Sequence, residues 1–413
     1  MEWCRPRCAS DARALEVSDT VARMIRRVVF IVVGLVVVLA AAFLVIPFVQ
    51  ARSLGAQLAT DVAAIRQTKW PRNPPVPNPR HDNGFQCFVA MLKVMPRDVS
   101  PFDGKGDTAA PNPGAWVRAE DPEPVKTMPP ELDARAQELS KWFDELRDCG
   151  NSRHLQYVDA LTPWALPPRY GEAVMALSRF TSLEVRKLVA NGLAEEAFNR
   201  CSSTLAFTLD QSHQGLLGAM VASASLRMLA PRCIEAWGAL PAPLRPLTSA
   251  GWVTLATRFA SAKEIFATER VCSSIYLFEP LAPHQGVPHV DELLLSDTTV
   301  ISRWLVLRSW SSWDARMRAL SQAAESPKER AQQAAALDAL GQSWMSPANF
   351  AGAANYEKFG ERVDQTRTVL TTLQWISGGA KGEPPPGMTR VDGAVEYKDA
   401  DGKVHRIAVP PLE

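Results

Sequence analysis

The chain has 413 residues, with 45 lysines and arginines against 44 aspartates and glutamates, and a formal net charge of +1. This balance leaves no basic excess to hold a phosphate backbone, which argues against nucleic-acid binding. The residues beyond position 49 suffice for one large or two ordinary domains with packed cores.

An uncharged apolar run covers residues 28–49, preceded by Arg26 and Arg27 and followed by Arg52. About 20 apolar helical residues cross the roughly 30 Å hydrocarbon layer of a bilayer, whereas the apolar core of a cleavable signal has about 7–15. We therefore expect a retained transmembrane helix at 28–49 that binds the lipid bilayer. The arginines at its N-terminal edge predict a cytoplasmic tail at 1–27 and an N-in, C-out orientation.

Two alternatives stay open at this end of the chain. Val49 and Ala51 form a V-x-A pattern that a signal peptidase could cleave after Ala51. Met24 is an alternative start to Met1, because residues 1–23 show no apolar periodicity. Arginine outnumbers lysine and alanine is abundant, a composition typical of GC-rich bacterial genomes. We therefore expect a single-pass protein of the bacterial inner membrane whose C-terminal domain is periplasmic.

Residues 50–80 are predicted to form a juxtamembrane helix followed by a proline-rich spacer. Five prolines between positions 71 and 79 favour an extended polyproline II segment. In 81–129 we expect a short helix around 85–94 and then a long loop, because this part is rich in proline and glycine and lacks periodicity.

Residues 130–378 are predicted to form an α-helical domain of helical hairpins. Apolar residues at spacings of three and four predict the inner faces of two successive helices, separated by the Asn191–Gly192 turn signal. Pro231 is expected to open a further helix, and Ser326 and Pro327 to begin a helix that Gly341 ends. The apolar positions of the two faces are Val174, Leu177, Thr181, Val185 and Leu188 in the first helix, and Phe198, Cys201, Leu205 and Leu209 in the second.

The last segment, residues 379–413, changes to a proline-rich linker followed by alternating apolar and polar residues. Alternation at 394–397 and 404–409, with turn residues at 399–402 between them, predicts a small C-terminal β-hairpin.

Cys87, Cys149, Cys201, Cys233 and Cys272 follow the apolar run and form no C-x-x-C pair. A zinc knuckle or thioredoxin-like redox motif is therefore not supported. In an oxidising compartment at most two disulfides can form, and Cys201 and Cys233 lie in predicted helices that could be neighbours. Buried thiols that act as small apolar side chains are the alternative.

The helix pair joined by Gly192, with Ala197 five residues later, resembles a tetratricopeptide-type hairpin. The resemblance covers one helix pair, and the chain has no traceable 34-residue period. It implies stacked helices with a concave partner-binding surface and no chemistry. A compact irregular helical bundle explains the same pattern, so the fold class expected is mainly α, with degenerate tetratricopeptide-like repeats as one form of it.

The sequence contains no G-x-S-x-G, H-E-x-x-H, Walker or G-x-G-x-x-G motif. His284, His289, Asp291 and Glu292 lie close together and form the best candidate for a metal site. Because glycine and proline make this stretch a loop, its spacing fixes no geometry, and an ordinary polar loop is the favoured interpretation.

Asp210, Ser212 and His213 form a second cluster of potentially reactive groups. The members of a catalytic triad normally converge from separate elements, so helix capping at a turn is the expected role of these residues. We assign no catalytic residue, cofactor or metal ligand from the sequence.

Trp304, Trp310 and Trp313 lie within one predicted helix, together with Arg303 and Arg308. Tryptophans of this kind can line a membrane interface. Core packing is the commoner role of large aromatic side chains and is the favoured interpretation.

These features favour a membrane-anchored protein whose extracytoplasmic helical domain binds another protein, as a scaffold or accessory factor of a cell-envelope complex. The alternative is a periplasmic hydrolase acting on cell-envelope material, with His213 or the pair His284 and His289 in its site.

Overall fold

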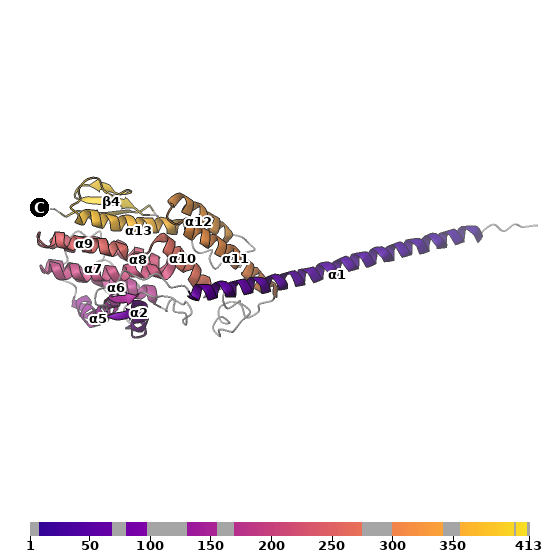
Figure 1. Cartoon of the computed structure of the whole chain (residues 1–413), viewed down its shortest axis with the longest axis horizontal. Coiled ribbons are helices and arrows are strands. Elements are labelled where there is room, and N and C mark those ends of the chain that lie inside the picture. The colour runs from indigo at the N-terminus through magenta and orange to yellow at the C-terminus, as the bar shows by residue number, and fades with distance from the viewer. Residues whose placement is uncertain are drawn as a thin grey trace, which may run out of the picture.

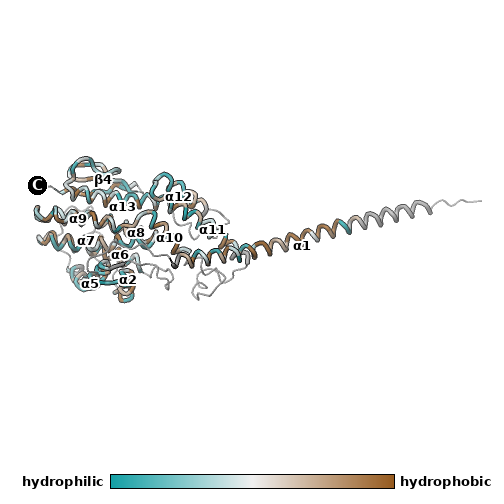
Figure 2. Tube along the Cα trace, in the orientation of Figure 1, coloured by the Kyte–Doolittle hydropathy of each residue, from teal (hydrophilic) through white to brown (hydrophobic). Residues whose placement is uncertain are grey.

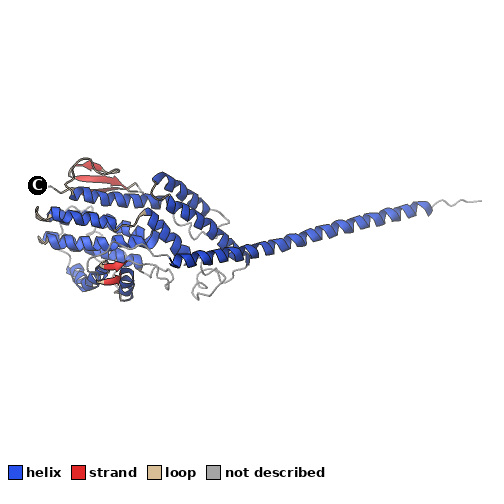
Figure 3. Ribbon diagram, in the orientation of Figure 1, coloured by secondary structure: helices blue, strands red, loops and turns tan. Residues whose placement is uncertain are grey.

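The computed structural model describes residues 8–67, 80–96, 130–154, 169–274, 300–341, 356–399 and 402–410. Within these ranges the chain is mostly helical, and it forms a long helical rod joined to an elongated body (Figures 1 and 3). The predictions of a mainly α fold and of one apolar N-terminal helix are confirmed.

The rod is helix α1, which runs without a break over Cys8–Gln67. Its apolar part projects away from the body (Figure 2), and among the described residues it is the one helix long and apolar enough to cross a membrane. This is compatible with a single-pass membrane protein. Beyond the apolar run, Ala51, Leu58 and Val62 are buried in the body. The same helix is therefore both the candidate anchor and a part of the core.

A small layer at one side of the body has its own apolar cluster, centred on Phe88, Phe143 and Phe180. A disulfide joins Cys87 to Cys149 within this layer. The sequence did not predict its two short strands, which pair in parallel through a few residues each. The elements are β1 (His81–Asn83), α2 (Gly84–Lys93), α5 (Pro130–Asp148) and β2 (Ser152–His154).

The centre of the body is formed by α6 (Tyr170–Ala190), α7 (Ala194–Asp210) and α8 (Gly215–Ala239), with the 3₁₀ turn η1 (Gln211–Gln214) before α8. The apolar faces predicted for the first two helices are buried, except that Leu188 near the end of α6 is only partly buried. Gly192 has a φ of 75°, and the backbone N–H groups of Gly192 and Leu193 bond to the carbonyl oxygens of Val189 and Leu188. This is the left-handed helix end that the Asn191–Gly192 pair predicted.

One prediction in this region is wrong: Pro231 does not open a new helix but lies inside α8. An interior proline costs about 3 kcal/mol in an isolated helix. Alpha8 is apolar on nearly all sides and is surrounded by other helices, so burial of its side chains outweighs that local cost.

The described part of the second half of the body adds five helices, among which α12 begins at Pro327 and ends at Gly341, as predicted. Alpha11 lies beside α1 where the rod leaves the body, and α13 packs on α8 and α9 (Figure 1). The helices are α9 (Arg245–Thr257), α10 (Ala262–Ser273), α11 (Val300–Gln322), α12 (Pro327–Gly341) and α13 (Tyr356–Ser377).

The C-terminal segment forms a three-stranded antiparallel sheet in the order β3 (Thr389–Val391), β4 (Ala394–Lys398) and β5 (Val404–Ala408). The predicted hairpin is present as β4 and β5, with Val395 opposite Ile407, and β3 was not predicted. The side chains of Val395 and Ile407 are buried and belong to the main apolar core. The predicted proline-rich spacer and most of the proline- and glycine-rich loop lie outside the described residues.

Candidate functional site

A groove of about 1040 Å³ runs along the outer face of α7. The C-terminal end of α5 forms one wall, and the corner between α8 and α9 forms the other. Alpha5, α7 and α9 lie at the end of the body opposite the rod (Figure 1). The groove is therefore held away from the apolar part of α1.

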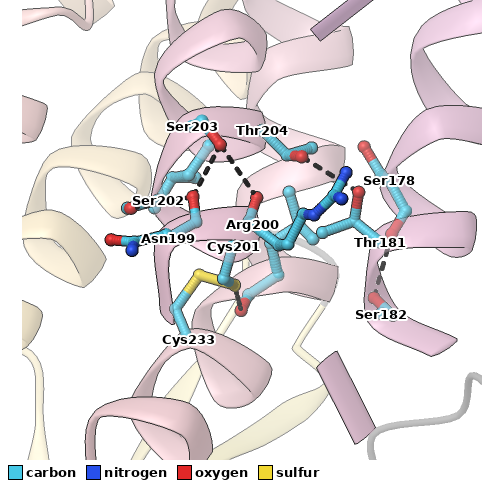
Figure 4. Close-up of a disulfide and its surroundings, with 12 residues drawn as sticks. Ser178, Thr181, Ser182, Asn199, Arg200, Cys201, Ser202, Ser203, Thr204 and Cys233 are labelled. Carbon is cyan, nitrogen blue, oxygen red and sulfur yellow. Dashed lines mark hydrogen bonds between the residues drawn. A yellow bond between two sulfur atoms is a disulfide. The ribbon is translucent and has the colours of Figure 1, made fainter. Parts of the chain in front are cut away.

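The groove floor consists of polar side chains of α7, which include Glu196, Asn199 and Ser203. Their spacing of three and four residues places them on one side of the helix, whereas Cys201 and Leu205 point into the core. A disulfide links Cys201 to Cys233 of α8 (Figure 4). This bond fixes α7 to the body from the side opposite the groove.

Arg147 of α5 connects the groove wall to α6 and α7. Its guanidinium, only 6% exposed, donates from Nε to Oγ1 of Thr204 over 2.7 Å and from Nη2 to Oε2 of Glu184 over 2.8 Å. Thr181 and Thr204 also share a hydrogen bond of 2.9 Å (Figure 4). Burial raises the pKa of Glu184, and the positive charges of Arg147 and Arg200 offset part of that rise.

The arginines that line the groove are each paired with a carboxylate. Arg200 bonds Asp144, Arg258 bonds Asp210, and Arg80 bonds Asp148 at 3.1 Å. The described lining also carries the exposed carboxylates of Glu195 and Glu196 at the start of α7. Because positive and negative groups alternate, the groove suits a polar segment of mixed charge better than a single anion.

The predicted cluster of Asp210, Ser212 and His213 is brought together, but its side chains face different partners. Asp210 is fully buried and bonds Arg258. The Ser212 hydroxyl donates to the Leu209 carbonyl over 2.6 Å and accepts from the Ala260 N–H over 2.8 Å. These bonds connect the end of α7 to the α9–α10 turn. Asp210 occupies the N-cap position of η1, but its side chain makes no capping hydrogen bond, so the capping role expected for this residue is corrected to an ion pair across the fold.

His213 bonds Glu264 through Nδ1, and its Nε2 lies 3.0 Å from the Arg258 carbonyl oxygen. Burial lowers the pKa of His213, but the hydrogen bond and charge of Glu264, together with Asp210, outweigh this effect and leave the pKa raised. Both ring nitrogens are occupied and the side chain is buried. His213 is therefore placed as a structural residue that connects η1 to α10.

The other predicted candidates have different outcomes. His284, His289, Asp291 and Glu292 lie outside the described residues. Trp310 and Trp313 are 1% and 3% exposed and fill the core, as the favoured interpretation predicted. Trp304 is only partly buried and contacts α1. Among the described residues, no group of three or more histidines, cysteines and carboxylates could hold a metal ion.

Cys272 is the free cysteine of the body, and it is buried. Burial raises its thiol pKa, and the nearby Glu269 raises it further. A protonated and inaccessible thiol is a poor nucleophile. In the described part of the groove, the hydroxyl group on the floor is that of Ser203, which donates a hydrogen bond to the Asn199 carbonyl over 2.6 Å. The described lining residues include no histidine and no cysteine.

Sequence reasoning missed the groove. The polar face of α7 is visible in the sequence at Glu196, Asn199 and Ser203, but such a face is typical of any solvent-exposed helix side. The walls include Asp148 and Pro241, which lie 38 or more positions away from these three residues, and the sequence gives no sign that these meet α7. Comparison of the chain with protein-family models, with curated proteins and with solved structures found no match.

Proposed function

We propose that this protein is a membrane-anchored scaffold or accessory factor whose extracytoplasmic body binds a segment of another envelope protein in the α7 groove. The groove itself carries the proposal. It is large enough for a polypeptide segment, it is lined by paired charges of both signs, and its described lining offers no nucleophile with an adjacent base.

The location is part of the proposal: a bacterial inner membrane, N-in, with the body in the periplasm. Two disulfides, Cys87–Cys149 and Cys201–Cys233, support an oxidising compartment. They pair four of the five cysteines that follow the apolar run, and the fifth, Cys272, is buried. The arginines before residue 28 support the N-in orientation.

The likeness of the α6–α7 pair to a tetratricopeptide hairpin supports the same role. In such repeats paired helices present a surface to a partner without chemistry of their own. Here the α6–α7 turn, at Gly192 and Leu193, opens directly into the groove.

The alternative function, a periplasmic hydrolase, has less support. His213 was its best candidate among the described residues, and this side chain is buried between Glu264 and the Arg258 carbonyl. A general base must reach the proton that it removes, and His213 does not line the groove.

Site-specific crosslinking in cells tests the proposal. A photo-crosslinking residue is placed at Asn199 or Ser203, which are exposed on the groove floor, and at Lys328, which is exposed on α12. We expect the same protein adduct from positions 199 and 203 and none from 328. Equal labelling at all three positions, or none from the groove, would contradict the proposal.

A further inference from the structure

Alpha11 begins at the level where the apolar run of α1 ends. Trp304 Nε1 donates to Oε1 of Gln50 over 2.7 Å, and farther along Arg318 bonds Asp61 over 2.9 Å. The two helices therefore run in the same direction, and the N-terminus of α11 lies at the end nearer the apolar part of α1 (Figure 1). Gln50 follows the last residue of the uncharged run, so a bilayer around 28–49 has its surface next to Trp304.

Trp304 differs from the two buried tryptophans of the same helix. Its ring is partly exposed, and the guanidinium carbon of Arg308 lies 5.4 Å from the ring centroid. A tryptophan with an apolar ring and a polar N–H is typical of the membrane–water interface. The Arg308 guanidinium remains exposed beside it.

In the described parts of α1 and α11, the charges at this level have one sign. In α1 from Gln50 to Thr60, and in α11 from Trp304 to Trp313, the charged side chains are Arg52 and Arg308, and neither stretch holds a carboxylate. Both arginines are exposed. The nearest acidic residues in these helices, Asp61 and Asp314, come at least a turn beyond Arg52 and Arg308 and are paired with Arg318.

The backbone of α11 extends past Trp304 toward the bilayer. The helix starts at Val300, and four residues at a rise of 1.5 Å reach about 6 Å farther. A helix end at this depth lies in the headgroup layer rather than in free solvent.

We propose that the start of α11 is a second membrane contact of this protein. Trp304 is placed in the interface, and Arg52 and Arg308 bind the phosphate groups of acidic phospholipids. The inference rests on α1 as the membrane span, which the proposed function shares. It gives the body two points of attachment to the bilayer, so that the groove at the opposite end is held at a fixed height.

The first test measures the depth of Trp304. The full chain is reconstituted in nanodiscs that contain phosphatidylcholine brominated near the glycerol backbone, and tryptophan quenching is recorded. We expect the quenched fraction to fall in Trp304→Phe. The matched control is Trp375→Phe, because Trp375 also has a bonded Nε1 and an arginine over its ring, but lies on α13 beside the C-terminal sheet.

The second test measures lipid choice. Spin-labelled phosphatidylglycerol and spin-labelled phosphatidylcholine are compared for the fraction that the protein immobilises. Basic residues near an anionic surface contribute about fivefold each, so the preference for phosphatidylglycerol should fall in the Arg52→Gln, Arg308→Gln double variant to the part that Arg26 and Arg27 contribute at the other surface. Lys328→Gln on α12 is the control for loss of charge alone.

The outcomes separate this inference from the proposed function. A chain that does not insert into nanodiscs overturns both. If it inserts and Trp304→Phe leaves quenching unchanged, or if the double variant keeps the lipid preference of the wild type, the second contact is overturned and the span remains.

Discussion

Asp210 on α7 and Arg258 after α9 form a two-pronged ion pair in which Oδ1 of Asp210 accepts from Nε of Arg258 over 2.8 Å and Oδ2 accepts from Nη2. Asp210 is fully buried. The same guanidinium donates to the Gly150 carbonyl over 2.9 Å. One arginine at the end of α9 thus connects α7 to the turn that follows α5, and all three lie at the groove.

Replacing Asp210 by asparagine should destabilise the protein strongly. The substitution leaves the buried charge of Arg258 without its counterion, and breaking a buried pair from one side costs about 3–5 kcal/mol. Thermal or urea unfolding of the detergent-solubilised protein measures the change. Glu145→Gln is the control, because its 4.0 Å contact with Lys141 is exposed and such pairs contribute about 0–1 kcal/mol. Similar losses in both variants would show that the Asp210–Arg258 pair has no special role.

The stability of the η1–α10 junction should depend on pH through His213. Its folded-state pKa is raised by Glu264 and Asp210, which together outweigh burial. The contribution of His213 to the free energy of unfolding is therefore complete below the pKa of histidine in the unfolded chain, about 6.5. It is lost as the pH rises through the folded-state pKa of His213. In His213→Gln and in Glu264→Gln, the melting temperature should fall less over that rise in pH than in the wild type. An unchanged pH profile in both variants would disprove this linkage.

The two disulfides should be found in the protein isolated from cells. Mass spectrometry of unreduced digests should recover Cys87 linked to Cys149 and Cys201 linked to Cys233, with Cys272 alkylated only after unfolding. The double variant Cys201→Ser, Cys233→Ser should lose about 2–4 kcal/mol of stability. Recovery of other pairs, or of free thiols throughout, would contradict the arrangement around α7.

Leu58 should connect the stability of the body to α1. Its side chain is completely buried against the body, and a Leu→Ala change in a core costs about 2–5 kcal/mol. Leu39 lies on the same helix within the apolar run and is exposed in the isolated chain, so Leu39→Ala should leave the unfolding of the body unchanged. Equal effects of the two substitutions would mean that α1 does not contribute to the core.

Local patterns predicted much of the fold. Pro327 and Gly341 mark a helix start and end that the structure reproduces, and the Asn191–Gly192 turn and the β4–β5 hairpin follow from local preferences in the same way. Pro231 was misinterpreted because the burial around α8 outweighs its local preference. The β1–β2 pair was missed because each strand has only three residues, too few for a detectable alternation.

The groove could not be predicted, because its walls meet only in the folded chain. Asp144 and Arg200 are separated by 56 positions and form an ion pair at its edge. Each is an ordinary charged residue on a helix when the sequence is considered alone. The cysteines Cys201 and Cys233, which form a disulfide in the structure, were the one sign in the sequence that α7 is fixed to α8.

The central claim is that α1 spans the membrane and places the body in an oxidising space. Paired reporter fusions at the C-terminal residue Glu413, one with alkaline phosphatase and one with green fluorescent protein, test it most directly. We predict an active phosphatase and a dark fluorescent protein in bacterial cells. A bright fluorescent protein with an inactive phosphatase would place the body in the cytoplasm and contradict the account.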